Sequence, residues 1–589
     1  MTFKHLSEYF QQLEKTTLRN KMVEILASLF KEANPAEIGK LCYLLQGRVA
    51  ALYTAVEFGV ADKMMIRAIS QGLEIDQKDV VTEFKKEGDL GTTAEKLRVR
   101  NKRKGTRNTI TISEVFTDLY KVASSTGDGS QEQKVTILAG LIRSVDPLSV
   151  RYVVRITLGK LRLGFSDMTM LDGFSWMEKG DKSGKETIEK AYNVRPDLAY
   201  IGETIKKYGI KGLHGVPKPG IPILMARANR LSSAEDILLK IGRCAVEYKY
   251  DGLRLQVHKD GKMLKMFSRN LEDVTSSFPD IAKAVRVQVH VDSIIFEGEV
   301  VAYNPKNGVF VPFQETMQRK RKYDIEKKAL EIPVKLFVFE LLFCNGKSFL
   351  GSPYFERKKK LKEVIQKGNT IVYAQEHIVS KEAQIDEIFD DSVEKNFEGI
   401  IAKKLEGLYE AGVRGWNWIK YKKAMNKKLT DTVDVLVMGY TKGEGKRTSF
   451  GVGQFLGGLY DEKRDMFVTV SKIGTGLTDE QFRDFFTRVK KLHAKEKPPL
   501  YDVDKLLEPD VWLEPSLVVE IACDEITRSA VHTAGRVMKP SKSGKAFAVD
   551  IPGYALRFPR LVRFRDDRRP QDATTVKEVM KMYGAQGKK

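Results

Sequence analysis

The sequence contains few of the residues that build disulfides and zinc sites. Its four cysteines (Cys42, Cys244, Cys344 and Cys523) lie far apart and form no CxxC pair. This spacing excludes a disulfide framework and a cysteine-ligated zinc module, and it favours a reducing compartment. Only seven histidines are present, and they show neither zinc-ligand spacing nor a catalytic triad.

Long apolar runs are absent as well. No stretch of 18 apolar residues exists, and the first residues, MTFKHLSEYF, have no apolar core of the signal-peptide type. We therefore expect no membrane-spanning segment and no membrane partner. This pattern predicts a cytoplasmic location.

Positive charge, by contrast, is in excess. The 100 lysines and arginines outnumber the 78 aspartates and glutamates, and the formal net charge of the 589 residues is +22. A balance this basic favours an acidic partner; in the cytoplasm nucleic acid is the leading candidate, so we expect association with the nucleoid. Hydrophobic residues make up 42% of the chain, and the length suits about three or four domains.

The pattern of apolar residues divides the chain into three zones. Residues 1–214 show the three- and four-residue spacing of helices and predict an all-α domain. Residues 215–424 open with the proline-rich HGVPKPGIPILMA and continue in strand-like segments such as SIIFEGEVVAYN, which predict an α+β domain with largely antiparallel sheets. Short strands between turn signals in residues 425–589 predict a small β-barrel.

Two basic segments of the first zone are candidate nucleic-acid contacts, and the second shares its predicted helix with Arg151 and Arg155. A charge run is more often a solvated face than a binding site, but two such runs in so basic a chain favour contact with phosphate. The candidates are Arg98, Arg100, Lys102, Arg103, Lys104, Lys160 and Arg162.

The segment CAVEYKYDGLRLQVHKDG, which begins at Cys244, places a lysine where a buried strand is expected to end. Lys249 follows an apolar run and has a carboxylate two residues away on each side, at Glu247 and Asp251. A lysine acts as a nucleophile only when its amine is neutral, and burial and neighbouring cations both lower a lysine pKa. A surface lysine before a hairpin turn explains KYDG equally well, so the other motifs must separate the two interpretations.

Carboxylates and lysines recur at spacings that suit phosphate transfer. Glu297 and Glu299 in FEGEVV lie two residues apart, so both face one side of a strand, and Glu398 occurs in the similar NFEGIIAKK. Carboxylate oxygens are the ligands that Mg²⁺ uses when it bridges to phosphate. Lys420 and Lys422 in WNWIKYKK also share one side of a strand and suit phosphate as point charges.

Six segments occur in the order of the nucleotidyltransferase motifs of ATP-dependent DNA ligases, a family that the chain resembles. They are KYDGLR (249–254), FSRN (267–270), FEGEVV (296–301), FVFE (337–340), FEGIIAKK (397–404) and WNWIKYKK (416–423). LGKLRLGFSDMTMLD (158–172) is similar to the signature of the helical DNA-binding domain of archaeal and eukaryotic replicative ligases, and RFPRLVRFRDD is similar to the basic final motif of their OB domain. The resemblance covers nearly the whole chain, and its arrangement is most similar to that of archaeal ligases.

The resemblance implies a multidomain fold. Residues 1–214 would form a helical DNA-binding domain, residues 215–424 an α+β nucleotidyltransferase (adenylation) domain with ATP-grasp-like antiparallel sheets, and residues 425–589 an OB-fold β-barrel. The C-terminal VKEVMKMYGAQGKK lies outside the motifs, and it reads either as a helix that docks on the catalytic domain or as a frayed tail.

The resemblance also implies roles for individual residues. Lys249 would be the catalytic nucleophile that receives AMP, Glu247 would lie near the adenine, and Phe339 would stack on the base. The other nucleotide-binding positions are Arg254, Arg269, Glu299, Arg414, Lys420 and Lys422, and the metal-associated carboxylates are Glu299 and Glu398. The six arginines between Arg557 and Arg569 would orient the pyrophosphate leaving group.

The implied activity is the sealing of nicks in double-stranded DNA, in replication, repair and recombination, with ATP and Mg²⁺ as cofactors. Lysine adenylation would be followed by transfer of AMP to the 5′-phosphate and by attack of the 3′-hydroxyl. We expect a monomer, with a sliding clamp as a candidate further partner. The residues leave open whether ADP or NAD replaces ATP.

Three other functions remain to be weighed. RNA ligases and mRNA capping enzymes share the lysine chemistry, but LGKLRLGFSDMTMLD has no place in a capping enzyme. A catalytically silent DNA-binding protein is disfavoured by the intact Lys249, Glu299 and Glu398. An NAD-dependent ligase is expected to carry a cysteine–zinc module that these cysteines do not form. The segment GDKSGKET does not fit the spacing of a P-loop.

Overall fold

The chain divides into two compact units, Met1–Lys422 and Lys423–Lys589. The computed structural model describes all residues except 102–108, 162, 312, 320–324, 396, 423–431, 444–450, 475–476, 541–546 and 587–589. In the part of the chain that is described, no helix is both long and apolar enough to cross a membrane.

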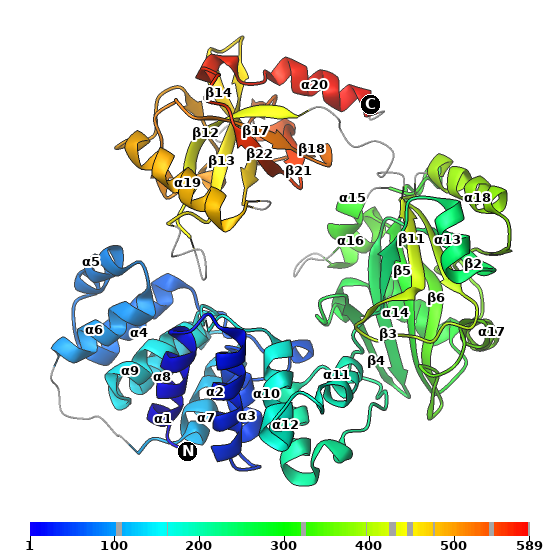
Figure 1. The fold of residues 1–589 in the computed structure, drawn as a ribbon, viewed down its shortest axis with the longest axis horizontal. Coiled ribbons are helices and arrows are strands. Elements are labelled where there is room, and N and C mark those ends of the chain that lie inside the picture. The colour runs from blue at the N-terminus through cyan, green and yellow to red at the C-terminus, as the bar shows by residue number, and fades with distance from the viewer. Residues whose placement is uncertain are drawn as a thin grey trace. The chain divides into compact units, whose positions relative to one another are not determined.

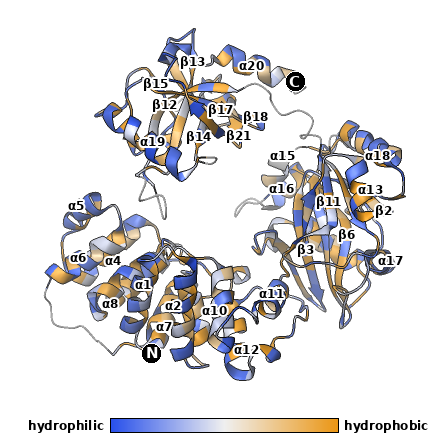
Figure 2. Cartoon of the chain, in the orientation of Figure 1, coloured by the Kyte–Doolittle hydropathy of each residue, from blue (hydrophilic) through white to orange (hydrophobic). Residues whose placement is uncertain are grey.

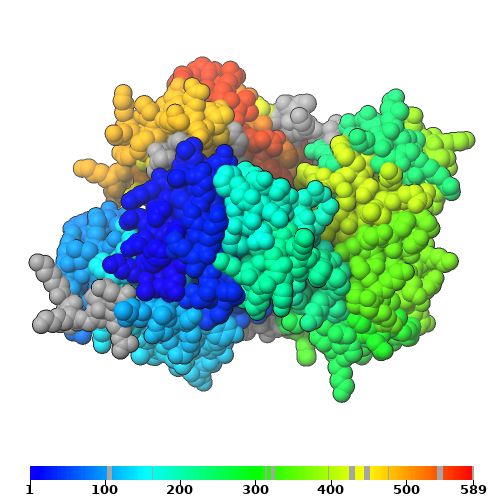
Figure 3. Space-filling view, turned by 60° about the horizontal axis from the view of Figure 1, so that its bottom comes forward, coloured from blue at the N-terminus to red at the C-terminus, as the bar shows by residue number. Residues whose placement is uncertain are grey.

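The first unit begins with a helical region (Figure 1), which confirms the prediction for this part of the chain. Its helices are α1 (Phe3–Glu14), α2 (Arg19–Glu32), α3 (Ile38–Leu45), α4 (Asp62–Leu73), α5 (Gln77–Glu87), α6 (Leu90–Arg100), α7 (Ile112–Ser124), α8 (Ser130–Ser144), α9 (Pro147–Thr157), α10 (Asp167–Lys179), α11 (Lys185–Val194) and α12 (Leu198–Tyr208). They share one apolar core, which includes Phe10, Phe30 and Phe174. In the space-filling view the first helices (blue) and α10–α12 (cyan) adjoin (Figure 3).

Local sequence signals begin and end these helices. Asn34 accepts hydrogen bonds from the backbone N–H groups of Ala36 and Glu37, which forms the turn between α2 and α3. Asp146 caps α9 through the N–H groups of Leu148 and Ser149, and proline stands at its first helical position. The dipeptides Asn34-Pro35 and Asp146-Pro147 thus both lie in turns between helices.

The rest of the first unit consists of two sheets with helices around them. The five-stranded sheet has the order β1 (Arg227–Arg230), β11 (Arg414–Lys422), β10 (Gly399–Lys404), β2 (Cys244–Lys249) and β9 (Glu376–Val379). The six-stranded sheet has the order β4 (Met263–Ser268), β3 (Leu253–Asp260), β5 (Ser293–Ala302), β6 (Val334–Cys344) and β7 (Lys347–Ser348), with β8 (Ile371–Tyr373) paired to β6. Most pairs are antiparallel, as predicted; β1–β11 and β6–β8 are parallel.

Helices cover the sheets on their outer sides (Figure 1). The helices of this part are α13 (Ala234–Ile241), α14 (Pro279–Gln288), α15 (Phe313–Met317), α16 (Ile325–Glu331), α17 (Tyr354–Val364) and α18 (Glu382–Glu394). Apolar residues of α13 and α18 pack on the five-stranded sheet, whereas α14 and α17 pack on the six-stranded sheet. The strands are accordingly rich in apolar residues (Figure 2).

The second unit is also rich in strands. Its main sheet has the order β15 (Tyr501–Asp502), β14 (Met466–Ile473), β13 (Gln454–Asp461), β12 (Val433–Thr441), β17 (Val518–Ala522) and β22 (Arg560–Phe564), with β16 (Val511–Trp512) paired to β12. Two hairpin-like pairs join β18 (Glu525–Ser529) to β21 (Gly553–Arg557) and β19 (Val537–Pro540) to β20 (Phe547–Ile551). Within the described residues, β15 and β22 do not pair, so strand pairing closes no barrel.

The second unit carries the helices α19 (Asp479–Val489) and α20 (Val576–Ala585). Thr575 and Glu578 form a capping box that begins α20, and Val579 is fully buried in the core of this unit. Gln586, just after α20, accepts a hydrogen bond from the N–H of Ile526. The C-terminal segment is therefore a helix that packs on its own unit, rather than a frayed tail.

Candidate active site

Lys249 stands at the end of β2, after five buried residues. Its backbone carbonyl accepts a hydrogen bond of 2.9 Å from the N–H of Glu398, which joins the strand end to the start of β10. The side chain remains 21% exposed. Lys249 is therefore held by the sheet while its amine stays accessible to a ligand.

A single carboxylate connects two of the predicted lysines. Glu398 Oε2 lies 2.7 Å from Lys249 Nζ and also pairs with the ammonium of Lys422. Although burial acts in the opposite direction, these two ammonium groups lower the pKa of Glu398 to about 2. The sequence led us to expect a neutral amine flanked by Glu247 and Asp251, whereas the structure shows an ion pair with Glu398. The amine must leave this carboxylate before it can attack a phosphate.

Glycine makes this arrangement possible at Gly399. Its φ of +135° is disfavoured for other residues, and a Cβ atom there would lie 2.2 Å from the carbonyl oxygen of Tyr421. Gly399 therefore lets β10 approach the backbone of β11, opposite Lys422. The glycine of the FEG motif thus places Glu398 between the two lysines.

Further cations lie near the ion pair of Lys249 and Glu398. Burial lowers the pKa of Lys420, and the charges of Lys422, Arg414 and Lys249 lower it further. Lys420 and Lys422 are on β11, two residues apart, as the period of the strand requires. Four predicted residues are thus close enough to form one positively charged region that suits phosphate groups.

The predicted metal ligand Glu299, on β5, is near this region. Burial raises its pKa to about 7, although Lys249 and Arg254 act in the opposite direction. No hydrogen-bond donor among the described residues is recorded for its carboxylate, so its oxygens fit a hard divalent cation. In the part of the chain that is described, no three acidic, histidine or cysteine residues could enclose a metal by themselves. A cation here would therefore need phosphate oxygens and water as further ligands.

Arg254, on β3, is fixed by Glu297 rather than by Glu299. Its guanidinium donates to Glu297 Oε2 at 2.6 Å and to the carbonyl of Ala226 at 2.8 Å. Glu297 is fully buried and also accepts hydrogen bonds from Tyr409 and Gln256. The two glutamates of FEGEVV thus differ in role. Glu297 positions Arg254, whereas no hydrogen-bond donor among the described residues contacts the carboxylate of Glu299.

Phe339, on β6, is half-buried between charged groups. Its ring contacts Trp418 edge-on at 6.1 Å, and the guanidinium of Arg254 lies 5.4 Å from its centroid. Phe339 packs against two apolar clusters, one of which includes Val246 and Ile400 and the other Ile295 and Leu342. A half-buried aromatic ring is able to stack on a planar base.

Glu247 is buried, with 3% of its surface exposed. Lys358 and Lys403 both pair with its carboxylate, and the hydroxyl of Tyr354 donates to it at 2.9 Å. Burial acts against ionisation, yet the two lysines keep the pKa of Glu247 below its usual range. Its side chain is thus engaged by protein groups. Sequence reasoning missed Lys358, because the segment RKKKLKEV has the composition of an exposed, charged helix.

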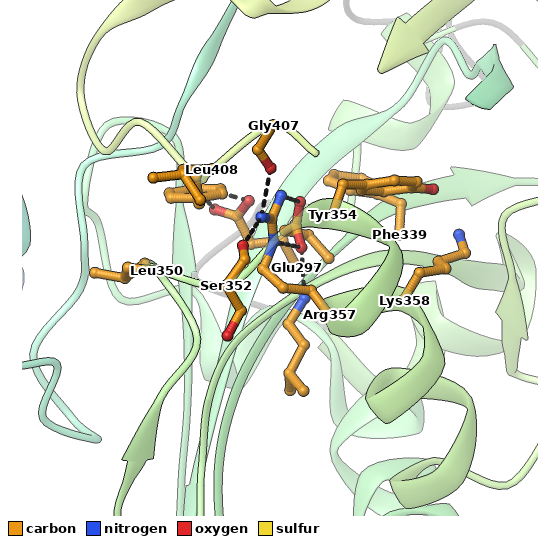
Figure 4. Close-up of polar contacts among 12 residues, drawn as sticks. Glu297, Phe339, Leu350, Ser352, Tyr354, Arg357, Lys358, Gly407 and Leu408 are labelled. Atoms are coloured by element: carbon orange, nitrogen blue, oxygen red, sulfur yellow. Dashed lines mark hydrogen bonds and ion pairs between the residues drawn. The ribbon is translucent and has the colours of Figure 1, made fainter. Parts of the chain in front are cut away.

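A second buried ion pair fixes α17 beside this cluster. Arg357 Nε and Nη2 donate to the two oxygens of Glu340 at 2.7 and 2.9 Å, and neither side chain is exposed. Arg357 also donates to the carbonyls of Ser352 and Gly407, which join α17 to two loops (Figure 4).

Replacing Arg357 with methionine should destabilise the protein by about 3–5 kcal/mol, because the buried carboxylate of Glu340 would lose the cation that balances its charge. The double variant R357M/E340M should recover most of this free energy of unfolding, since it removes both charges. Denaturation with urea measures both effects. Equal losses in the single and double variants would show that the ion pair does not hold α17.

Arg269 lies one residue beyond Ser268, which pairs with Leu255, the residue after Arg254 on β3. It follows β4 on an exposed turn, and no contact with the residues above is recorded for it among the described residues. Arg414 begins β11 and is exposed. Their predicted contacts with the nucleotide therefore stay predictions.

Those candidate DNA contacts of the helical region that the structure describes have protein partners. Arg98 is 5% exposed and donates to the carbonyl of Arg143, which points to a structural role. Arg100 pairs with Glu83, and Lys160 pairs with Asp62. The other candidates, Lys102, Arg103, Lys104 and Arg162, lie outside the described residues.

The neighbouring arginines of α9 are also engaged. Arg155 pairs with Glu14 and Asp89, and Arg151 donates to Glu95. These two arginines lie in an ion-pair network that joins α1, α6 and α9. Spacing on a helix did not distinguish them from residues that face solvent.

The arginines of the final motif form ion pairs within the second unit. Their partners are Glu525 for Arg557, Asp524 for Arg560, Glu520 for Arg563, Asp434 for Arg565 and Arg568, and Asp572 for Arg569. A role toward pyrophosphate would require some of these surface pairs to open, which costs little because exposed ion pairs are weak. That role stays a prediction.

Three families match the chain, and they define its class. The family described as "DNA ligase N terminus" matches residues 2–175, "ATP dependent DNA ligase domain" matches residues 225–422, and "ATP dependent DNA ligase C terminal region" matches residues 448–568. All the nucleotide-site positions described above fall within the second match.

Related proteins and a solved structure are similar to the chain over nearly its whole length. A probable DNA ligase of Dictyoglomus turgidum is 44% identical over the whole chain and 98% of its own length. The DNA ligase of Pyrobaculum calidifontis is 39% identical over the whole chain and 99% of its own length. The solved structure Pmar-Lig_PreS3, 19% identical, has a TM-score of 0.54 over 95% of this chain and 99% of its own, which supports the fold. The chain belongs to the ATP-dependent DNA ligase family, and the predicted resemblance is confirmed.

Proposed function

We propose that Lys249 is the nucleophile through which this ATP-dependent DNA ligase seals nicks in duplex DNA. The observation that carries the proposal is the shared carboxylate of Glu398, which holds Lys249 Nζ at 2.7 Å and Lys422 on the same oxygen. A nucleophile and a phosphate-binding cation are thereby held at one point. Each chemical step needs in-line geometry and neutralisation of charge, which these groups supply.

In the first step Lys249 Nζ attacks the α-phosphorus of ATP. A P–N bond forms, the bond to the bridging oxygen breaks, the amine loses a proton and pyrophosphate leaves. Lys420 and Lys422 stabilise the negative charge on the α-phosphate, while Arg254 and Phe339 hold the nucleoside. Glu299 and Glu398 would hold Mg²⁺, which supplies further positive charge to the phosphates.

The next two steps use the same residues on DNA. The 5′-phosphate of the nick attacks the adenylate, which breaks the P–N bond and releases Lys249. The 3′-hydroxyl then attacks the 5′-phosphorus, a phosphodiester bond forms and AMP leaves. The lysine pair is again next to the phosphate under attack, so one set of cations serves all three transfers.

We propose three domains for this cycle: residues 1–214 for DNA binding, residues 215–424 for adenylation with ATP-grasp-like sheets, and residues 425–589 as an OB-fold. Support for the OB-fold comes from the antiparallel order β14–β13–β12–β17 and from α19, which follows the first three strands. The two-sheet architecture of the first unit supports the ATP-grasp-like core.

Substrate comparison tests the proposal directly. With ATP and Mg²⁺ the protein should join a nicked DNA duplex, and labelled GTP should leave no covalent label on the protein. A preference for nicked RNA would indicate an RNA ligase, and labelling by GTP would indicate a capping enzyme. Either result would contradict the proposal.

A further inference from the structure

Lys403 is a buried ammonium that the steps above do not use. It lies on β10, and its side chain is 1% exposed. Its Nζ is 2.6 Å from Glu247 Oε2 on β2 and donates to the carbonyl of Phe339 on β6 at 3.3 Å. One ammonium therefore connects a strand of the five-stranded sheet to the backbone of Phe339 in the other sheet.

Three aromatic rings enclose this ammonium. Lys403 Nζ lies 4.8 Å from the ring centroid of Phe339, 5.0 Å from that of Tyr354 and 4.7 Å from that of Trp418. Cation–π attraction acts within about 6 Å and strengthens when the cation is removed from water. Figure 4 shows Phe339, Tyr354 and Lys358 close to one another on the same side of Arg357. The charge of Lys403 thus acts on both the ring and the backbone of Phe339.

The carboxylate of Glu247 pairs with two ammonium groups, although one would balance its charge. Lys358 pairs with Oε1 and Lys403 with Oε2, so two buried ammonium groups share one carboxylate. Removing either lysine leaves a neutral pair, which is the arrangement that a buried site tolerates. The two lysines are therefore equivalent for the balance of charge, but only Lys403 touches Phe339.

We propose that Lys403 is a positioning residue for ATP, which holds the ring of Phe339 in the orientation that stacks on the base. This inference rests on the proposed placement of the base against Phe339. Glu247 fixes the ammonium through its ion pair, so the distance between the ring of Phe339 and β2, the strand that carries Lys249, is maintained. This role explains why Glu247, which was predicted to lie near the adenine, forms ion pairs with lysines in the structure.

The test compares K403M with K358M. Purified protein is first freed of bound adenylate with pyrophosphate, and the rate of protein labelling is then measured over a range of ATP concentrations. For K403M we expect the half-saturating ATP concentration to rise about tenfold or more, with the maximal rate within about threefold of the original. For K358M we expect little change, because Lys403 and Phe339 remain in contact.

Matched controls are available beside each lysine. Lys404 and Lys359 are exposed neighbours on β10 and α17, so K404M and K359M should behave as the unaltered protein. Thermal unfolding of all four variants separates positioning from folding. Equal defects in K403M and K358M, an unchanged ATP dependence in K403M, or a K403M protein that does not fold would overturn the proposal.

One further variant separates this inference from the proposed site. F339L should raise the half-saturating ATP concentration if the base stacks on this ring. An unchanged value in F339L would show that the placement of the base is wrong. A raised value in F339L together with an unchanged value in K403M would show that only the role of Lys403 is wrong.

Discussion

Replacing Lys249 with alanine is expected to abolish nick sealing with ATP, with a loss of at least about 1,000-fold. The reason is chemical, because the substitution removes the amine that Glu398 holds beside Lys422. The measurement is the covalent label that the protein retains in denaturing gels after incubation with α-labelled ATP and Mg²⁺. K249A should retain none.

Two controls make this result specific. K404A removes an exposed lysine of the adjacent strand β10 and should label normally. K249A should also retain some joining of a nicked DNA that already carries AMP on its 5′-phosphate, because that step needs no lysine nucleophile. Covalent label in K249A at the original level would contradict the assignment of the nucleophile.

Replacing Lys422 with alanine should slow lysine adenylation by about 100–1,000-fold, the range found when one charge-stabilising group is removed from an active site. Two effects add. The α-phosphate loses a cation, and Glu398 is left with Lys249 as its remaining ion-pair partner in the structure, which holds the nucleophile more firmly. Single-turnover labelling with ATP measures this rate.

The arginine variant K422R refines the interpretation. It keeps the charge and can still pair with Glu398, so it should recover part of the lost rate. Joining of pre-adenylated nicks reports the later step, in which Lys249 is no longer bonded to phosphorus. A K422A protein that labels at the original rate would show that Lys422 does not act on the α-phosphate.

Much of the site could be predicted because its residues follow the two-residue period of strands. Glu297 and Glu299, or Lys420 and Lys422, must share a side once each strand is recognised. The period does not reveal which partner each side chain finds in another strand. Glu297 therefore emerged as the partner of Arg254 only in the structure.

Charged residues that become buried were the hardest to predict. Arg357 and Lys358 lie in a run of lysines and arginines, which ordinarily marks an exposed helix face, yet both are buried against Glu340 and Glu247. Arg98 was expected to contact DNA, and it is instead buried against a backbone carbonyl. Such outcomes depend on partners elsewhere in the sequence, which the local pattern does not show.

The C-terminal unit shows a similar limit. Turn signals predicted its short strands, and the strands are present. Closure of a sheet into a barrel, however, depends on pairing between strands that are distant in sequence, and in the described residues the end strands β15 and β22 do not pair with each other. The family and the sheet-rich fold could thus be predicted from the sequence, whereas the pairing of the strands in the C-terminal unit could not.

Peptide mapping by mass spectrometry gives the most direct test of the central claim, that Lys249 carries the adenylate. The protein is incubated with ATP and Mg²⁺ without DNA, digested, and searched for the added mass of AMP. The structure predicts that the added mass falls on the peptide containing Lys249 and disappears after pyrophosphate is added. AMP on any other residue, with Lys249 unmodified, would contradict it.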